Sequence, residues 1–167
     1  MEALESRAIQ ADARLSECGR YRYRLWRRWA EGPQALFILL NPSTADAHVD
    51  DPTLRRCMSF AQREGCAALE VVNLMAWRAT SPADLPSDPI RACGPENLDH
   101  IRAAVVSTHG PIIAGWGAHP MAATLAGALL TELRAMGRQV HALRLTKSGA
   151  PGHPLYIPKE APLIAFR

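Results

Sequence analysis

The feature that most constrains the fold is a run of six residues without a polar group, at positions 35–40, which ends abruptly in Asn41-Pro42-Ser43-Thr44. A short apolar run of this kind is typical of a strand that is buried on both faces of its sheet. Proline cannot continue a central strand, so the chain must leave the sheet at Pro42. The run therefore indicates a sheet that other elements cover on both sides.

The same pattern recurs three times further along the chain. Strands are predicted at 68–72, 111–114 and 139–145, and apolar residues show helical spacing at 52–64, 95–107 and 120–136. Strands that alternate with helices in this way form parallel sheets. We expect an α/β fold, a three-layer sandwich with a mostly parallel central sheet of about four strands plus antiparallel edge strands.

Two further strands are expected at the edges of the sheet. Between residues 20 and 25, arginine alternates strictly with Tyr21, Tyr23 and Leu25, which is the pattern of a half-buried strand. The turn residues at 31–34 predict that this strand forms a hairpin with the 35–40 strand. The tail at 162–167 is expected to add a last edge strand.

The arginines of the 20–25 strand, Arg20, Arg22 and Arg24, allow two interpretations. Basic residues interleaved with aromatic residues are typical of surfaces that bind nucleic acid. Charges on a solvated edge strand also prevent aggregation, and in that case they bind nothing. We favour the second interpretation and keep the three arginines as candidate nucleic-acid contacts.

The composition is that of a globular protein. Hydrophobic residues make up 48% of the 167 positions and charged residues 21%, which allows one domain with a real core. We expect one α/β domain over 1–167, with 1–17 as a peripheral segment. No apolar run reaches the roughly 18 to 20 residues that span a bilayer, and the mixed-charge N-terminus is not a secretory signal. We therefore expect a cytoplasmic protein without membrane contact.

The cysteines give no sign of a metal site. The four of them, Cys18, Cys57, Cys66 and Cys93, form no CxxC pair, which argues against a zinc knuckle and against a disulfide framework. Histidines at metal-binding spacing are also missing from the sequence. No metal and no cofactor are expected.

Unusual polar or small residues follow each of the four predicted central strands. They are Asn41 and Ser43, then Asn73, then Gly115-Trp116-Gly117, then the loop that carries Lys147 and His153. In open α/β sheets, ligands bind at the carboxyl ends of the strands. The convergence of these residues on one rim predicts a small-molecule or nucleobase site.

Each of these residues has a functional interpretation and a structural one. The amides of Asn41 and Asn73 can read the edge of a base, or they can stabilise their own turns. His153 can donate to a developing oxyanion, or it can be an exposed loop residue. Asp46, Asp50 and Asp51 could hold a water molecule or a metal; Asp46 is the best candidate for the water, and Asp51 is more typical of a helix cap. Lys147 suits a phosphate contact. The glycines around Trp116 allow a ligand to approach the backbone, although Trp116 can also simply pack.

The blocks at these positions resemble a bacterial family of unknown function over about residue 18 to the end. The blocks are Asn41-Pro42-Ser43-Thr44-Ala45-Asp46, Asp50-Asp51-Pro52-Thr53, Val72-Asn73-Leu74 with Arg78-Ala79-Thr80, Gly115-Trp116-Gly117, and Gly152-His153-Pro154-Leu155-Tyr156. More distantly, the layout is similar to the uracil-DNA glycosylase superfamily. Asn41-Pro42-Ser43 stands at its first motif, Asn73 at its base-reading asparagine and His153-Pro154 at its closing motif, while Ser43 and Leu155 depart from the residues usual there.

That resemblance implies a uracil-DNA-glycosylase-like fold and a hydrolase of N-glycosidic bonds in nucleic acid or nucleotides. Asn41, Asp46 and His153 would then be catalytic, and Asn73, Ser43, Gly115, Trp116 and Lys147 would bind the substrate. The alternative is a non-catalytic nucleotide or nucleic-acid binding module on the same scaffold. In both cases the expected partner is nucleic acid or a nucleotide.

Overall fold

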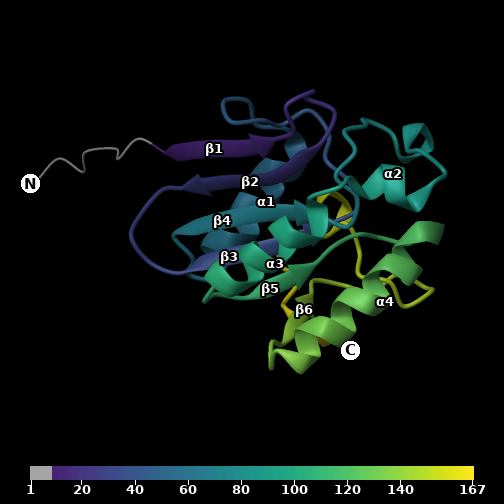
Figure 1. Ribbon diagram of the computed structural model, residues 1–167. Helices are drawn as coiled ribbons and strands as arrows, with labels where there is room; N and C mark the ends of the chain where they lie inside the picture. The colour runs from purple at the N-terminus through teal and green to yellow at the C-terminus, as the bar shows by residue number, and fades with distance from the viewer. Residues whose placement is uncertain (1–8) are drawn as a thin grey trace, which may run out of the picture.

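A seven-stranded sheet with helices on both faces forms the centre of the computed structural model, which describes residues 9–167 (Figure 1). The strands are β1 (Gln10–Leu15), β2 (Arg22–Arg28), β3 (Gln34–Leu39), β4 (Ala68–Asn73), β5 (Ile112–Ala114), β6 (Val140–Ala142) and β7 (Ile164–Phe166), in the order β1-β2-β4-β3-β5-β6-β7.

The predicted α/β class is confirmed, but the sheet is mixed. The pairs β3–β4, β3–β5 and β5–β6 are parallel, whereas β1–β2, β2–β4 and β6–β7 are antiparallel. The three parallel pairings join β4, β3, β5 and β6, and the three antiparallel ones lie toward the two edges of the sheet. β6 is also shorter than the strand predicted at 139–145, because the chain leaves the sheet after Ala142.

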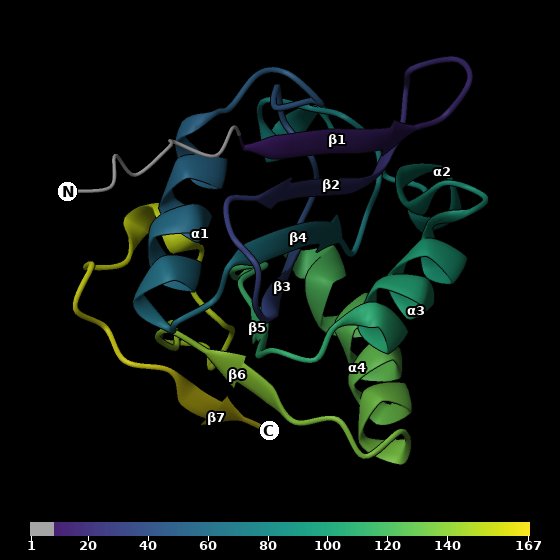
Figure 2. The same ribbon diagram turned by 90° about the vertical axis from the view of Figure 1, so that its left-hand side faces the viewer.

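Helices form the outer two layers. They are α1 (Pro52–Arg63), α2 (Pro89–Cys93), α3 (Asn97–Ser107) and α4 (Pro120–Ala135), with short 3₁₀ turns at η1 (Pro82–Asp84) and η2 (Pro154–Tyr156). Figure 2 shows α1 on one face of the sheet and α3 and α4 on the other. None of the helices within residues 9–167 is long and apolar enough to cross a membrane.

The two faces of β3 explain why its sequence is continuously apolar. Leu36 and Ile38 pack with side chains of α3 and α4, whereas Phe37 and Leu39 pack with side chains of α1. Side chains alternate along a strand, so a strand covered on both faces needs an apolar residue at every position. β3 is thus the central strand that the sequence predicts, and its C-terminal end lies in the middle of the rim.

α1 begins where its sequence predicts. The Asp51 carboxylate accepts a hydrogen bond from the Leu54 backbone N–H at 2.8 Å, and Pro52 occupies the first helical position, where its missing N–H costs nothing. The helix ends before Gly65, which adopts a φ of 76°. This capped N-terminus fixes the position of the Asp51-Pro52-Thr53 segment beside the end of β3.

The predicted hairpin between the 20–25 strand and β3 is wrong. β2 lies between β1 and β4 and is antiparallel to both, while β3 pairs with β4 and β5. All six residues of β4 are buried, so this strand gains most from a position between two others. β1 then covers β2, using residues that were predicted to be peripheral. Residues 1–8 of the predicted 1–17 segment lie outside the described part of the chain.

The strict alternation predicted for β2 also breaks down. The regular ladder with β4 covers Leu25 to Arg28, whereas the Arg22 N–H bonds to the carbonyl of Ala76, beyond the end of β4. The Arg22 side chain donates to the carbonyl of Ala45 in the loop after β3. The Tyr23 ring stacks on His100 of α3. β2 is an inner strand, so the interpretation of its arginines as charges on a solvated edge strand is wrong.

Candidate functional site

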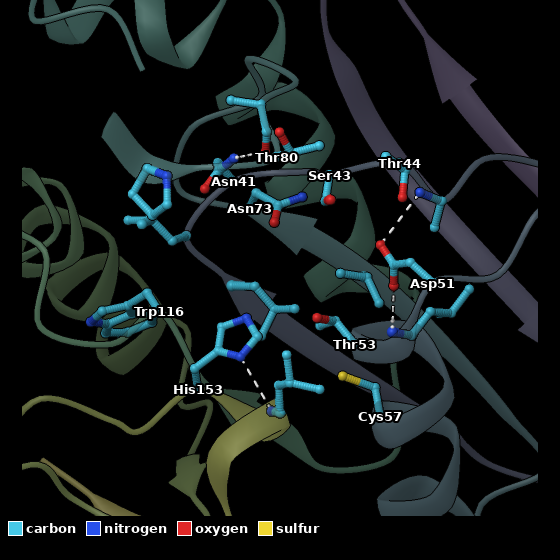
Figure 3. Close-up of a pocket in the computed structure, with 18 of the residues that line it drawn as sticks. Asn41, Ser43, Thr44, Asp51, Thr53, Cys57, Asn73, Thr80, Trp116 and His153 are labelled. Carbon is cyan, nitrogen blue, oxygen red and sulfur yellow. Dashed lines mark hydrogen bonds between the residues drawn. The ribbon is translucent and has the colours of Figure 1, made fainter. Parts of the chain in front are cut away.

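A pocket of about 480 Å³ lies at the carboxyl ends of β3 and β4 (Figure 3). The loop after β3 forms one wall and the N-terminus of α1 another, and the segment that carries His153 lies opposite the β3 loop. The apolar part of the lining includes Leu39, Val71 and Trp116. Its polar side chains are Arg22, Asn41, Ser43, Thr44, Asp51, Thr53, Asn73, Thr80, His119, His153 and Tyr156.

Asn73, the last residue of β4, carries the most unusual polar group of this pocket. Its side chain is 1% exposed, and neither the amide nitrogen nor the amide oxygen has a hydrogen-bond partner. Figure 3 shows the amide directed into the pocket, between Asn41 and Ser43. A buried amide without partners is costly unless another molecule supplies the missing hydrogen bonds.

Asn97 of α3 holds the backbone on which Asn73 sits. The Asn97 amide is buried, and its Nδ2 donates to the carbonyls of Asn73 at 2.8 Å and Leu74 at 3.1 Å. These two bonds tie the exit of β4 to the first turn of α3. They involve only the backbone carbonyls of Asn73 and Leu74, so they hold the backbone at Asn73 in place and do not use its side-chain amide.

Asn41 fulfils the structural one of its two predicted roles. Its Nδ2 donates to the carbonyls of Ala79 at 2.9 Å and Pro42 at 3.1 Å, so the amide holds its own turn against the segment after β4. Because the amide nitrogen is used in this way, the oxygen is the atom left for a ligand. Asn41 therefore offers an acceptor, whereas Asn73 offers a donor and an acceptor.

His153 lines the pocket as the cap of η2. Its Nδ1 accepts a hydrogen bond from the Leu155 N–H at 3.2 Å, and Figure 3 shows the other ring nitrogen on the side that faces Asn73. Burial lowers the pKa of His153, while the nearby Asp51 charge acts in the opposite direction. The neutral ring must carry its proton on Nε2, because Nδ1 is an acceptor. His153 thus presents an N–H donor to the pocket.

His119, which the sequence analysis missed, repeats this arrangement. Its Nδ1 accepts from the Met121 N–H at 3.2 Å as the cap of α4, and the residue lines the same pocket. In both places histidine precedes proline, which occupies the first helical position. The repeated His-Pro pair was the signal that could have identified His119 from the sequence.

Arg22 and Asp51 place one charge of each sign at the pocket. The Asp51 carboxylate accepts from the N–H groups of Leu54 and Ala45. Arg22 is 4% exposed, donates from Nη1 to the Ala45 carbonyl at 2.8 Å and has a buried Nε without a partner. Burial lowers the pKa of Arg22 to about 10, and Asp51 opposes that shift. The sequence analysis predicts Arg22 as a nucleic-acid contact rather than a pocket residue, and it favours a helix cap over a site role for Asp51.

Three of the predicted catalytic and substrate-binding residues, Asp46, Lys147 and Gly115, are not in the lining. The Asp46 carboxylate accepts from the N–H groups of His48 and Val49, both at 2.8 Å, and these bonds lower its pKa. Asp46 therefore stabilises its own turn. Lys147 is exposed on the loop after β6 and does not contribute to the pocket.

Gly115 and Trp116 follow β5 but differ in their roles. A Cβ atom at Gly115 would lie 2.9 Å from Leu39 and from Pro154, so this glycine allows the closing segment to pack against β3. Trp116 is buried, contacts Phe166 edge-on at 5.7 Å and also lines the pocket. It both packs and contributes to the site.

The arginines of the predicted nucleic-acid contact do not act together. Arg22 faces the pocket, Arg24 forms an ion pair with the buried Glu70, and Arg20 lies over the Trp77 ring at 4.7 Å. Within residues 9–167 no group of three or more His, Cys, Asp or Glu side chains could hold a metal ion.

Comparison with known proteins identifies one family. The model of the family described as "Protein of unknown function (DUF1643)" matches residues 22–155, which include β2 to β6 and every residue that lines the pocket except Tyr156. No curated protein and no solved structure matches the chain.

Proposed function

The chain belongs to the DUF1643 family, whose description gives no function, and we propose that it binds a nucleobase, free or as part of a nucleotide or nucleic acid. The observation that carries this proposal is the Asn73 amide, which is buried without partners at the wall of the pocket. A carboxamide has a donor and an acceptor side by side, and this pattern matches the hydrogen-bonding edge of a base.

The remainder of the pocket fits a flat, largely apolar ring. Leu39, Val71 and Trp116 supply apolar surface, and a volume of about 480 Å³ is within the usual range for small-molecule sites. The Nε2–H of His153 and the amide oxygen of Asn41 add a donor and an acceptor. In this proposal Asn73 fixes the edge of the base, and the other two groups select its orientation.

A second candidate function is hydrolysis of an N-glycosidic bond. It is supported by a neutral N–H donor, His153, and a carboxylate, Asp51, which line one pocket. A departing base accumulates negative charge, which a preorganised donor would stabilise. Asp51 is better placed than Asp46 to hold the attacking water, since Asp46 is outside the lining. The resemblance to uracil-DNA glycosylases supports the same candidate.

The test is a binding titration with free bases, nucleosides and nucleoside monophosphates, measured by calorimetry for the wild type and for Asn73→Leu. We expect at least one base to bind, and the substitution to weaken its binding at least tenfold, as for a lost pair of hydrogen bonds. Ser148→Ala, on the exposed loop after β6, is the control that should bind normally.

Two results would contradict the proposal: no base binds at millimolar concentration, or Asn73→Leu binds as well as the wild type. Chromatography of the same mixtures, and of the protein incubated with oligonucleotides, separates the two candidates. Release of free base from a nucleoside or oligonucleotide supports the hydrolase, while binding without release supports the non-catalytic module.

A further inference from the structure

Two arginines stack on one tryptophan beside the pocket, and a third follows that tryptophan in the chain. The guanidinium groups of Arg20 and Arg91 lie over the Trp77 ring, at 4.7 and 5.0 Å from its centroid. Arg78 follows Trp77 directly and lines a shallow hollow together with Cys18, Gly19, Arg20 and Trp77. We call Arg20, Trp77, Arg78 and Arg91 the rim cluster.

Within residues 9–167, no arginine of the rim cluster forms a direct ion pair, although the Asp46 carboxylate lies near enough to Arg78 for their charges to interact. The ion pairs formed within residues 9–167 involve Arg24, Arg27, Arg63 and Arg102, but none of the arginines of the cluster. Arg20 and Arg91 are exposed, and their stacking on Trp77 holds both charges in place. Fixed, unpaired cations on an aromatic side chain are suited to phosphate groups.

The cluster is continuous with the wall of the pocket. Ala79 and Thr80, which follow Arg78, line the pocket, and the Ala79 carbonyl accepts a hydrogen bond from Asn41. The Arg78 N–H bonds to the Arg20 carbonyl at 3.0 Å, and its guanidinium to the Gly19 carbonyl at 3.2 Å. The segment that carries the cluster is therefore anchored to the segment that forms the pocket.

An exposed aromatic ring belongs to the other side of the pocket. Tyr156 is 81% exposed although it contributes to the pocket lining, and its ring lies 5.7 Å from that of His153. Figure 3 shows Thr80 and His153 on opposite sides of the cavity. Because Tyr156 follows His153 in η2, the tyrosine and the rim cluster adjoin opposite walls.

We infer that the ligand is a base within single-stranded nucleic acid, whose phosphates contact the rim cluster and whose neighbouring base stacks on Tyr156. This inference rests on the proposed function of the pocket. A base must be unpaired to enter such a pocket, and single strands are bound by basic residues with exposed aromatic rings. A mononucleotide would leave most of the rim cluster unused. This surface replaces Arg24, which forms an ion pair with Glu70, as the nucleic-acid contact, while Arg22 faces the pocket.

The experiment compares fluorescence anisotropy of labelled DNA and RNA single strands of about 12 nucleotides for the full chain and three variants. Arg20→Gln/Arg91→Gln removes two charges of the cluster and leaves its backbone contacts intact. Arg134→Gln/Arg167→Gln removes two charges beside β7 and is the matched control. Tyr156→Ala removes the ring.

We expect the cluster variant to bind single strands roughly tenfold more weakly at low salt. The slope of the logarithm of the binding constant against the logarithm of the salt concentration should become shallower by about 1.4, which is about 0.7 for each lost phosphate contact. Tyr156→Ala should weaken it by about tenfold with an unchanged salt slope, as for a lost stacking contact. The control variant should bind single strands normally. Binding of a nucleoside, which has no phosphate, should be the same in the cluster variant as in the wild type.

The inference is overturned if the cluster variant binds single strands as tightly as the wild type. It is also overturned if single strands bind no better than a mononucleotide, or if polyglutamate competes as well as DNA, which would indicate an acidic protein partner. Failure of the proposed function gives a different result. In that case single strands still bind through the cluster, but Asn73→Leu changes nothing and no base binds alone.

Discussion

Asn73→Leu should make the protein more stable while it removes ligand binding. Leucine has a similar size and no polar atoms, and it would replace an amide whose nitrogen and oxygen are both buried without partners. Each unsatisfied buried group costs about 1–3 kcal/mol. Leu39 and Val71 line the same pocket and offer apolar contacts. We expect the free energy of unfolding to rise by about 2 kcal/mol, allowing for imperfect packing.

Asn97→Leu provides the contrast, because this second buried asparagine donates to the carbonyls of Asn73 and Leu74. Its Oδ1 is also buried without a partner, but the loss of two bonds to backbone carbonyls outweighs the removal of that atom, and the free energy of unfolding should fall by about 2 kcal/mol. Urea unfolding measures both changes, and a melting curve should show shifts of roughly 4–8 °C in opposite directions. If Asn73→Leu is destabilised by more than about 1 kcal/mol, the amide is a structural group and our reasoning is refuted.

Three further predictions concern the frame of the pocket. Gly115→Ala should lower the free energy of unfolding by about 1–3 kcal/mol in urea titration, because its Cβ would meet Leu39 and Pro154 at 2.9 Å; unchanged stability would show that the closing segment moves freely. Asp51→Ala should cost about 1 kcal/mol through loss of the α1 cap, whereas Asp51→Asn, which still caps, should keep stability and reveal any need for the charge in base release. Because the pKa of His153 is lowered in the folded protein, this histidine takes up a proton at higher pH in the unfolded chain, and stability should fall as the pH drops below about 6.5. The pH dependence of the free energy of unfolding should be weaker in His153→Asn, and the remaining dependence should come from His100, whose pKa is also lowered. An equal pH dependence in the variant and the wild type would contradict the assignment.

Local signals in the sequence were sufficient for much of the fold. Residues that are close together in the sequence predict both the capped start of α1 at Asp51-Pro52 and the apolar strand β3. The structure contains both. The pairing of β2 could not be read in the same way. A short turn before β3 suggests a hairpin, but the burial of β4 between β2 and β3 decides the order, and that gain depends on residues far apart in the chain.

The candidate site shows the same division. The topology of an α/β sheet brings the carboxyl ends of its parallel strands to one rim. Asn41, Asn73 and His153 line one pocket at that rim. The direction of a loop side chain depends on which backbone groups it bonds, which the sequence does not reveal. Asp46 turns toward the N–H groups of His48 and Val49, and Asp51, five residues later, is the carboxylate of the pocket.

The distribution of unsatisfied groups is the strongest reason to regard this pocket as a binding site. Six buried side-chain nitrogen or oxygen atoms lack partners in the described part of the chain, and three of them belong to Asn73 and Arg22, which both line it. Elsewhere around the pocket the polar groups that could serve the fold do so: Asp51 caps α1, and Asn41 and the two histidines bond to backbone. The fold thus provides hydrogen bonds for the neighbouring polar groups but none for the Asn73 amide. This amide destabilises the folded protein, and a leucine in its place would not. The simplest physical reason for that cost is a ligand that makes the missing hydrogen bonds.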